Sequence, residues 1–248
     1  MELGSNTVLV TGGASGIGYA LAERFLRAGS AVIICGRRED KLRSAQAAHP
    51  ALHIRIADLA EESDRVSVAS SLVRDFPRLN VLVNNAGIQR YIPLADDDWT
   101  GLRQEIAINF EAPIRLSTLF IPHLRTQSAA AIVNVTSGLS FVPLARAPVY
   151  SATKAALHSF TRSLRHQLAD TSIRVIEIIP PAVNTDLGGP GLHTFGVNLD
   201  EFADAVMPRI AAGELEVAYG FAEQSSRASR NELEGMFTRM NQPGSARS

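Results

Sequence analysis

Tyr150 and Lys154 lie four residues apart in the segment Tyr150-Ser151-Ala152-Thr153-Lys154. This spacing places two side chains on the same face of a helix. A free tyrosine has a pKa of about 10 and is a poor base at neutral pH, but a nearby cation favours the phenolate and lowers such a pKa by roughly 1–3. The pair therefore predicts a tyrosine that exchanges a proton with a substrate. The alternative is an ordinary surface pair, because this spacing is common by chance.

Polar residues follow several apolar runs that are predicted to be strands. Asn84-Asn85-Ala86-Gly87 ends one run, Ser137 ends the next, and Asn109 lies in the helical stretch between them. Ligands of open α/β sheets bind beyond the carboxyl ends of the strands. These side chains are therefore predicted to meet a ligand near Tyr150, although singly each would also be explained as a turn or cap residue.

A glycine-rich turn, Thr11-Gly12-Gly13-Ala14-Ser15-Gly16-Ile17-Gly18, separates the first predicted strand from the first predicted helix. Gly12 permits a tight turn, Gly16 lets the backbone approach a pyrophosphate, and Gly18 lets the helix pack closely on the strand. The start of the helix then offers unpaired N–H groups to the phosphates. Glycines also serve plain turns, but this context favours a dinucleotide site.

The residues after the second predicted strand select the coenzyme. Gly36 carries no carboxylate to bind the adenosine ribose, whereas Arg37 can bind a 2′-phosphate. We therefore expect NADP rather than NAD, the alternative being that Arg37 and Arg38 are a solvated helix start. Asp58, after the third strand, is expected to accept a hydrogen bond from the adenine amino group unless it is a simple surface residue.

Together these motifs resemble the short-chain dehydrogenase/reductase family in its compact single-domain branch, over Thr7 to about Tyr219. The resemblance implies that Tyr150 is the general acid/base, that Lys154 lowers its pKa and binds the nicotinamide ribose, and that no metal is needed. It also implies that Ser137 hydrogen-bonds the substrate oxygen and that Asn109 holds a proton-relaying water. The implied coenzyme-binding residues are Gly12, Ser15, Gly16, Ile17, Gly18, Arg37, Arg38, Asp58, Leu59, Asn85, Ala86, Gly87, Tyr150, Lys154, Pro180, Val183 and Thr185.

One segment departs from the family pattern, which has Pro-Gly where this chain has Pro180-Pro181. Proline fixes φ and removes an N–H, so the contacts of Val183 and Thr185 with the nicotinamide carboxamide are less secure. A narrower resemblance, to the branch encoded beside teichoic-acid D-alanylation genes in some bacteria, rests on the runs I-I-C-G-R-R, N-N-A-G-I-Q-R and I-P-P-A-V-N-T-D-L-G-G. That likeness does not name a reaction.

The elements that position these residues alternate between strand and helix along the chain. This alternation predicts an α/β fold of Rossmann type, a doubly wound parallel sheet with helices on both faces. The family resemblance implies about seven strands. One domain spans 1–248, with a helical extension and tail over 220–248. The predicted strands are Thr7–Thr11, Ala31–Cys35, Leu52–Ile56, Asn80–Asn84, Ala131–Thr136, Ile173–Ile179 and Glu216–Tyr219. The predicted helices are Ile17–Ala28, Glu39–Ala48, Glu61–Phe76, Asp96–Arg125, Tyr150–Ala169, Leu199–Ala212 and Arg227–Met240, followed by a disordered tail, Asn241–Ser248.

Composition narrows the classes of function. The net charge is -1, and the longest basic run is Arg37-Arg38, so neither a nucleic acid nor a membrane surface is an expected partner. Cys35 is the single cysteine, and Met1–Asn6 lack the features of a signal peptide. A reducing cytoplasm is the expected compartment.

The sequence thus predicts an NADP-dependent oxidoreductase acting on a small carbonyl or alcohol substrate. The rivals are a non-catalytic dinucleotide-binding regulator and a non-redox epimerase or lyase. A homodimer or homotetramer is expected through the faces that carry Ala107, Ala112, Ala155, Ala156 and Phe160. The candidate pocket walls are Gln89, Arg90, Tyr91, Leu139, Phe141, Leu144, Arg146, Leu187, Leu192, His193 and Phe195.

Overall fold

A computed structural model describes residues 1–96, 98–189, 191 and 194–242, and within them the strands form one parallel sheet. The sheet has seven strands in the order β3-β2-β1-β4-β5-β6-β7, which confirms the predicted Rossmann-type fold. The strands are β1 (Thr7–Thr11), β2 (Ala31–Gly36), β3 (His53–Ile56), β4 (Val81–Asn84), β5 (Ala130–Val135), β6 (Ile173–Ile179) and β7 (Glu216–Ala218). The predicted bounds agree with these to within one residue at each end.

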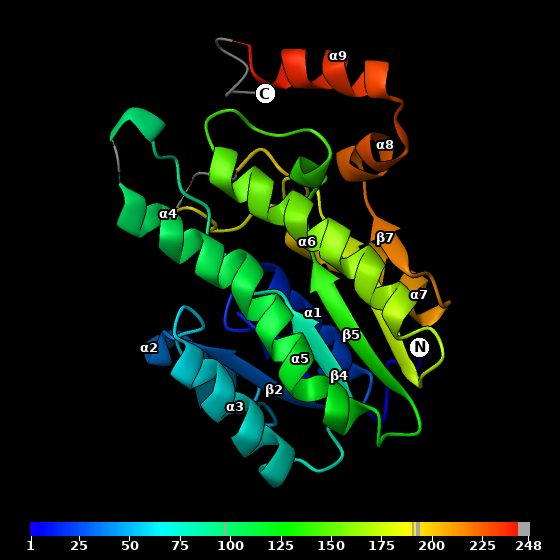
Figure 1. The fold of residues 1–248 in the computed structure, drawn as a ribbon. Helices are drawn as coiled ribbons and strands as arrows, with labels where there is room; N and C mark the ends of the chain where they lie inside the picture. Colours follow the sequence, from blue (N-terminus) through cyan, green and yellow to red (C-terminus); the bar gives the residue numbers. More distant parts are fainter. Residues whose placement is uncertain (97, 190, 192–193, 243–248) are drawn as a thin grey trace.

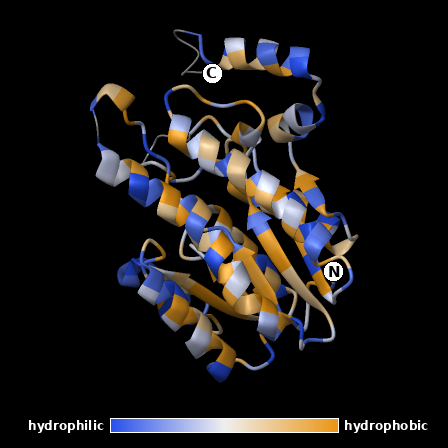
Figure 2. Ribbon diagram, in the orientation of Figure 1, coloured by the Kyte–Doolittle hydropathy of each residue, from blue (hydrophilic) through white to orange (hydrophobic). Residues whose placement is uncertain are grey.

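Helices cover both faces of the sheet (Figure 1). One face is packed by α1 (Gly16–Arg27), α2 (Glu39–Ala48) and α7 (Leu199–Ala211), and the other by α3 (Glu62–Asp75), α5 (Ala112–Leu124) and α6 (Pro148–Gln167). Val8 and Val10 face the first layer and Leu9 faces the second, all fully buried. Strands buried on both sides read as continuous apolar runs, and the strands are accordingly the most hydrophobic elements in Figure 2.

The single helix predicted over Asp96–Arg125 is wrong in two respects. Its first α-helical residue is Trp99, because Asp98 caps α4 (Trp99–Ile106) by accepting a hydrogen bond from the Gly101 backbone N–H at 3.0 Å. A π-helical turn, η2 (Ala107–Glu111), then separates α4 from α5. Pro113 has no N–H to donate to the carbonyl four residues earlier, so the regular α-helical ladder cannot continue there.

The expected dimer faces need a correction as well. Ala112 is buried in the core between α5 and the sheet, and Phe160 of α6 packs partly against the same core. Ala112 therefore packs inside this chain, whereas the Phe160 side chain remains partly exposed.

The C-terminal segment also differs from its prediction. The helix predicted over Arg227–Met240 is present as α9 (Arg230–Met240), and a further helix, α8 (Phe221–Arg227), which was not predicted, precedes it. Ser229 starts α9 because its hydroxyl caps the Glu232 backbone N–H while the Glu232 carboxylate accepts from the Ser229 N–H, a capping box. Asn241, expected in a disordered tail, is hydrogen-bonded to Ala145 and Pro143. The rest of that predicted tail, 243–248, lies outside the described residues.

The strand order reverses between β1 and β4, where successive connections run to opposite sides of the sheet. A crevice forms at such a switch point, at the carboxyl ends of the strands. The glycine-rich turn after β1 and the Asn-Asn-Ala-Gly segment after β4 both lie at this edge. Among the described residues, no helix combines the length and apolar character needed to cross a bilayer.

Candidate active site

The turn between β1 and α1 is held against the end of β4 by Asn85. The Asn85 side-chain amide donates to the Thr11 carbonyl at 2.9 Å. Gly12 has a φ of +63°, and a Cβ there would meet the Ala86 Cα at 2.9 Å. A Cβ on Gly18 would overlap the Asn85 amide and the Gly12 carbonyl. Glycine is therefore required at 12 and 18 by close packing, and at 12 also by backbone conformation.

Thr11 is a site residue that sequence reasoning missed. Its buried hydroxyl donates to the Val83 carbonyl at 3.1 Å and accepts from the Asn85 and Ala86 backbone N–H groups at 2.9 and 3.0 Å. One side chain thus fixes the ends of β1 and β4 relative to each other. A threonine directly before the first glycine is the signal that could have identified it.

A cavity of about 980 Å³ lies along this edge of the sheet. It is named the coenzyme cavity after the residues that were predicted to bind a coenzyme. Most of the predicted coenzyme residues line it: Gly12, Ser15, Gly16, Ile17, Arg37, Arg38, Asp58, Leu59, Asn85, Ala86, Gly87, Tyr150, Lys154, Pro180 and Thr185. Gly18 is buried beneath the turn and is not in the lining, and Val183 lines a second cavity instead.

Two arginines reach the mouth of the coenzyme cavity. Arg38 donates from Nη2 to the Ser15 hydroxyl at 3.1 Å, across the glycine turn, while Arg37 is exposed in the lining. Ser15 is not itself basic, but Arg38 brings a second positive charge to the same place. One oxygen of Asp58 accepts from the Ala60 backbone N–H at 3.0 Å, which leaves the other for the adenine contact expected from the sequence.

Ser137, Tyr150 and Lys154 are brought together where β5 ends and α6 begins. Tyr150 and Lys154 are both buried in the first two turns of α6, and the Tyr150 phenol is hydrogen-bonded to Ser137. The Lys154 Nζ lies 5.7 Å from the centre of the Tyr150 ring and donates to the Val135 carbonyl at 2.8 Å. The predicted helical spacing therefore produces the predicted cluster.

The acid–base properties of this cluster differ from the expectation that Lys154 lowers the pKa of Tyr150. Burial raises the pKa of Tyr150 above its usual value, the Ser137 hydrogen bond opposes that rise, and the nearby Glu105 adds to it. Burial also lowers the pKa of Lys154 to about 8. Removal from water disfavours the charged form of each group, so the phenol is held protonated in this structure.

Asn109 occupies the centre of the π-helical turn η2 and is fully buried. Its side-chain oxygen accepts from the Ile88 N–H at 2.9 Å, and its amide donates to the Ile88 carbonyl at 2.8 Å and to the Thr153 hydroxyl at 3.3 Å. A Cβ on Gly87 would lie 3.3 Å from the Asn109 side-chain oxygen and 3.7 Å from the Lys154 Nζ. Asn109 therefore holds the segment after β4 next to Lys154, but it lines neither cavity.

Glu105 is a second residue that sequence reasoning missed. It is fully buried one helical turn before Asn109, and its Oε1 accepts from the Arg90 backbone N–H at 3.1 Å. Its Oε2 has no hydrogen-bond partner within the described part of the chain, and burial raises the pKa of this carboxyl to about 7. A glutamate on the inward face of an amphipathic helix, four residues before Asn109, is the signal that was available.

A second cavity, of about 940 Å³, adjoins the first and shares Ser137 and Tyr150 with it. Of the predicted pocket walls, it contains Gln89, Tyr91, Leu139, Leu144, Arg146, Leu187 and Phe195. Arg90 lines the coenzyme cavity instead, and Leu192 and His193 lie outside the described residues. The cavity walls that α8 and α9 contribute were not predicted, because no local pattern in the sequence shows that this extension packs back over the sheet.

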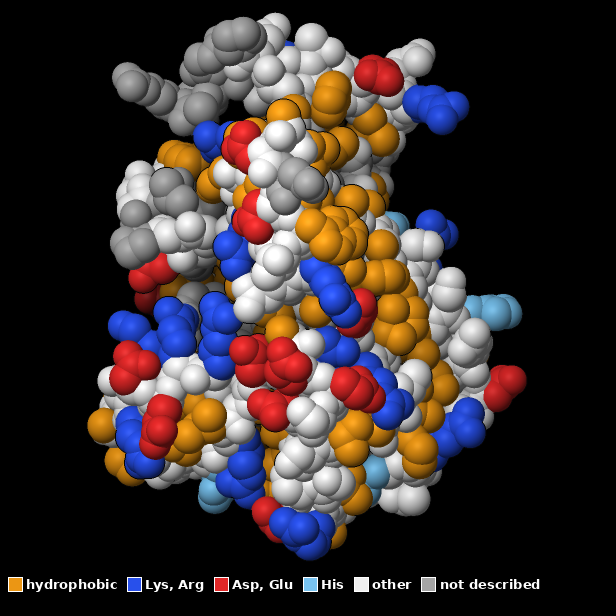
Figure 3. Space-filling view, turned by 60° about the vertical axis from the view of Figure 1, so that its left-hand side comes forward, with side chains coloured by type: hydrophobic (Ala, Val, Ile, Leu, Met, Phe, Trp, Pro, Cys, Tyr) orange, Lys and Arg blue, Asp and Glu red, His pale blue; other side chains and the backbone are white. Residues whose placement is uncertain are grey.

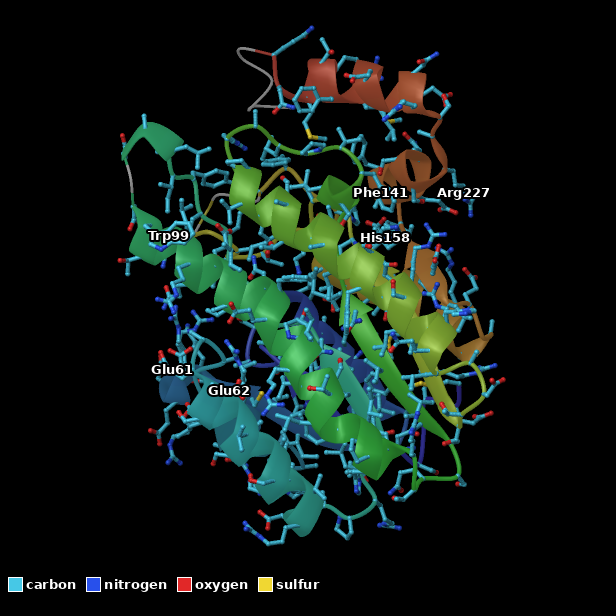
Figure 4. All side chains as sticks on the ribbon, in the orientation of Figure 1. Glu61, Glu62, Trp99, Phe141, His158 and Arg227 are labelled. Atoms are coloured by element: carbon cyan, nitrogen blue, oxygen red, sulfur yellow. The ribbon has the colours of Figure 1, made fainter. Side chains whose placement is uncertain are left out.

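Phe141 is not a wall of either cavity. Its ring packs edge-on against His158 of α6, with 4.8 Å between ring centres (Figure 4). His158 in turn faces Glu177 of β6, with its Nδ1 3.0 Å from the carboxylate, and the buried Glu177 accepts from the Thr136 hydroxyl at 2.6 Å. This network supports the backbone next to Ser137 from behind the site.

Comparisons with known proteins agree with this geometry. The family model for short chain dehydrogenase matches residues 6–192. The chain is 45% identical over 248 residues to the uncharacterized oxidoreductase DltE of Bacillus subtilis (strain 168), covering 97% of this chain and 98% of that protein.

Solved structures extend the likeness to the whole fold. A short chain dehydrogenase from Burkholderia cenocepacia J2315 in complex with NADP has a TM-score of 0.83 at 27% identity, covering 96% of this chain and 99% of that one. A short-chain dehydrogenase from Sphingobium yanoikuyae in complex with NADPH has a TM-score of 0.81 at 27% identity, covering 96% and 97%. The glycine turn, the Tyr150–Lys154 helix and these matches have one explanation: the chain belongs to the short-chain dehydrogenase family of oxidoreductases.

Proposed function

We propose that this protein is an NADP-dependent oxidoreductase that transfers hydride between nicotinamide and a carbonyl/alcohol pair, with Tyr150 as the general acid/base. One observation carries the proposal: Tyr150 and Ser137 line both cavities. Whatever occupies the coenzyme cavity and whatever occupies the second cavity therefore meet at a phenol and a hydroxyl. A substrate oxygen placed there would be bound by two groups that can donate hydrogen bonds.

Each side chain of the site has its own role in the proposed hydride transfer. Bound nicotinamide supplies or accepts the hydride. Ser137 and Tyr150 bind the substrate oxygen and stabilise the negative charge that develops on it. Tyr150 gives its phenolic proton to that oxygen when a carbonyl is reduced, and burial keeps the phenol protonated for that step. Lys154 and Asn109 hold the segments on either side of Tyr150, as their bonds to Val135 and Ile88 suggest.

NADP is the proposed coenzyme, with NAD as the less favoured choice. Support comes from Arg37 and Arg38 at the mouth of the cavity, since guanidinium groups bind phosphate strongly and often through two bonds. The structural neighbours crystallised with NADP or NADPH are consistent with this choice. Gly36, at the end of β2, carries no carboxylate that would repel a 2′-phosphate.

The decisive experiment is the Tyr150→Phe substitution, which removes the phenolic proton and keeps the ring. Turnover of a carbonyl panel, followed by NADPH absorbance, should fall by about 10²–10⁴, while NADPH affinity measured by calorimetry should stay within about twofold of wild type. Unimpaired turnover would refute the assignment of Tyr150. Coenzyme binding by wild type with no turnover of any carbonyl compound would favour the regulator.

Assembly and compartment belong to the same proposal. We propose a homodimer or homotetramer, because the family's compact members associate through faces of these long helices, and mass measurement in solution tests it. The small-molecule substrate and near-neutral net charge of -1 leave no role for a nucleic acid or a membrane, and the buried Cys35 suits the cytoplasm.

A further inference from the structure

The second cavity is roofed by a segment of the chain that the family match, which ends at residue 192, does not include. Phe221 and Gln224 of α8 and Met236, Arg239 and Met240 of α9 face it. Helix α9 stands apart from the sheet and crosses above α6 (Figure 1). The shape of this cavity is therefore specific to chains that carry such an extension.

Asn241 fastens the end of α9 to the loop between β5 and α6. Its side-chain oxygen accepts from the Ala145 backbone N–H at 2.7 Å, and its amide donates to the Pro143 carbonyl at 3.1 Å. Arg146 directly follows Ala145, and Arg239 lies two residues before Asn241. The same two hydrogen bonds thus bring two arginines, from segments far apart in the sequence, to the rim of one cavity.

The charges around this cavity are of one sign. Among its described lining residues, Arg146 and Arg239 are charged and no carboxylate is present. Neither guanidinium has an ion-pair partner within the described part of the chain. Arg146 instead lies over the Tyr91 ring, 4.8 Å from its centre, which holds it in place without neutralising it.

The remainder of the lining is largely apolar. Leu139, Leu144, Leu187, Phe195, Met236 and Met240 contribute to it, and hydrophobic side chains reach the surface just below the top of the molecule, where α9 lies (Figure 3). Methionines of this kind adapt to ligands of irregular shape. A volume of about 940 Å³ lies within the range that holds a substrate-sized molecule.

We propose that this cavity binds a carbonyl compound with an apolar body and an anionic group remote from the carbonyl, the anion being bound at the rim by Arg146 and Arg239. The inference rests on the proposed function for the reacting end, at Tyr150 and Ser137. The binding of the anionic end rests on a different observation: two guanidinium groups without an ion-pair partner among the described residues lie above an apolar lining. An anion there gains charge-assisted hydrogen bonds and an ion-pair attraction, whereas a neutral oxygen can only accept a hydrogen bond and gains no ion-pair attraction from either arginine.

The test compares aldehydes that differ only in charge: ω-oxo carboxylates of increasing chain length and their methyl esters. Wild-type protein with NADPH should prefer the carboxylate in kcat/KM by about tenfold to a hundredfold. In Arg239→Gln and in Arg146→Gln this preference ratio should fall by about tenfold each. Rising salt should reduce the ratio in wild type, since exposed charges are screened.

The matched control is Arg230→Gln, which removes an exposed arginine at the other end of α9, outside the cavity lining. It should keep the wild-type ratio. A second readout needs no turnover: calorimetry of a straight-chain carboxylate and the corresponding primary alcohol against the NADP⁺-loaded protein. The carboxylate should bind more tightly, and each cavity variant should reduce the difference in affinity by about tenfold.

The outcomes separate the two proposals. Reduction of both aldehydes with equal kcat/KM, unaffected by either variant, would overturn the anionic substrate and leave the oxidoreductase intact. Carboxylate binding that depends on both arginines, without turnover of any aldehyde, would support the anion site and count against Tyr150 chemistry. Carboxylate and alcohol binding equally would overturn the anion site in either case.

Discussion

The Lys154 ammonium donates to the carbonyl of Val135, the last residue of β5, at 2.8 Å. Burial of that ammonium lowers the pKa of Lys154 to about 8. Because α6 and β5 are adjacent, this bond joins the helix that carries Tyr150 to the strand that precedes Ser137. Lys154 therefore has a structural task at the same time as any chemical one.

Stability should depend on the protonation of Lys154 in alkaline solution. In the unfolded chain the lysine loses its proton near pH 10.5, and in the folded chain near pH 8, so between these values the unfolded state binds more protons. This group's contribution to the free energy of unfolding therefore rises from pH 8 to pH 10.5. Urea unfolding of wild type and Lys154→Met at pH 7.5, 9 and 10 should show the difference between them changing with pH. A constant difference would contradict the lowered pKa.

Glu105 should act in the opposite sense at lower pH. Its pKa is about 4.5 when unfolded and about 7 when folded, so the folded state holds the extra proton between these values. This group's contribution to the free energy of unfolding falls as the pH rises through that range. Glu105→Gln should match wild type near pH 4.5 and be more stable at pH 8 by up to about 3 kcal/mol, since a pKa change of one corresponds to about 1.4 kcal/mol. Chemical denaturation at both pH values measures this.

The control for that substitution is Glu234→Gln on α9, which is exposed. It should shift stability equally at both pH values. If Glu105→Gln behaved in the same way, the buried carboxyl would not be titrating near neutrality.

Arg37→Ala should weaken NADPH by about tenfold to a hundredfold and leave NADH nearly unchanged, because only NADPH carries the phosphate that a guanidinium binds with charge-assisted hydrogen bonds. Calorimetric titration of both coenzymes gives the comparison. Lys41→Ala removes an exposed cation from α2 that does not line the cavity, and it should spare both affinities. Equal losses of affinity for NADPH and NADH in Arg37→Ala would mean that this arginine does not bind the 2′-phosphate.

Gly18→Ala should damage the glycine turn without touching the cavity surface. The added methyl group overlaps the Asn85 amide, whose position fixes the turn. We expect weaker NADPH binding and a free energy of unfolding lower by about 1–3 kcal/mol. Gly36→Ala, where a Cβ meets nothing within 4 Å, should leave the unfolding transition unchanged. Wild-type stability in Gly18→Ala would show that the overlap is relieved elsewhere.

Short-range patterns in the sequence were sufficient to predict most of the sheet and the grouping of Ser137, Tyr150 and Lys154. Apolar runs such as Val32–Ile34 specify buried strands. Tyr150 and Lys154 lie in the same helix, α6, so their four-residue spacing places both side chains on one face.

The environments of Trp99 and Glu105 were harder to predict. Trp99 is exposed at the start of α4 (Figure 4). Glu105 is buried, where a carboxylate is not expected. The exposure of Trp99 depends on how α4 packs, which no local pattern contains, whereas the position of Glu105 on the inward face of the helix was a usable signal.

The roof of the second cavity could not be predicted for a similar reason. The bonds from Asn241 to Ala145 and Pro143 join residues almost a hundred positions apart, and neither end has a distinctive composition. The π-helical turn around Asn109 was also missed, although Pro113 in the middle of a helical stretch indicates an interrupted ladder. Helix bounds depend on such caps and breaks more than on apolar periodicity.

The strand order also governs the sequence of events during synthesis. Strand β1 pairs with β2 on one side, but its other neighbour is β4, through contacts such as Val8 with Val81, so the sheet around β1 is completed only after a later segment has been made. Pairing between distant segments is slow because a long loop has to close first. Until Asn85 has been made, its side-chain amide cannot donate to the carbonyl of Thr11. The glycine turn is thus translated among the first residues, but its contact with the end of β4 forms only after the intervening strands and helices have been made.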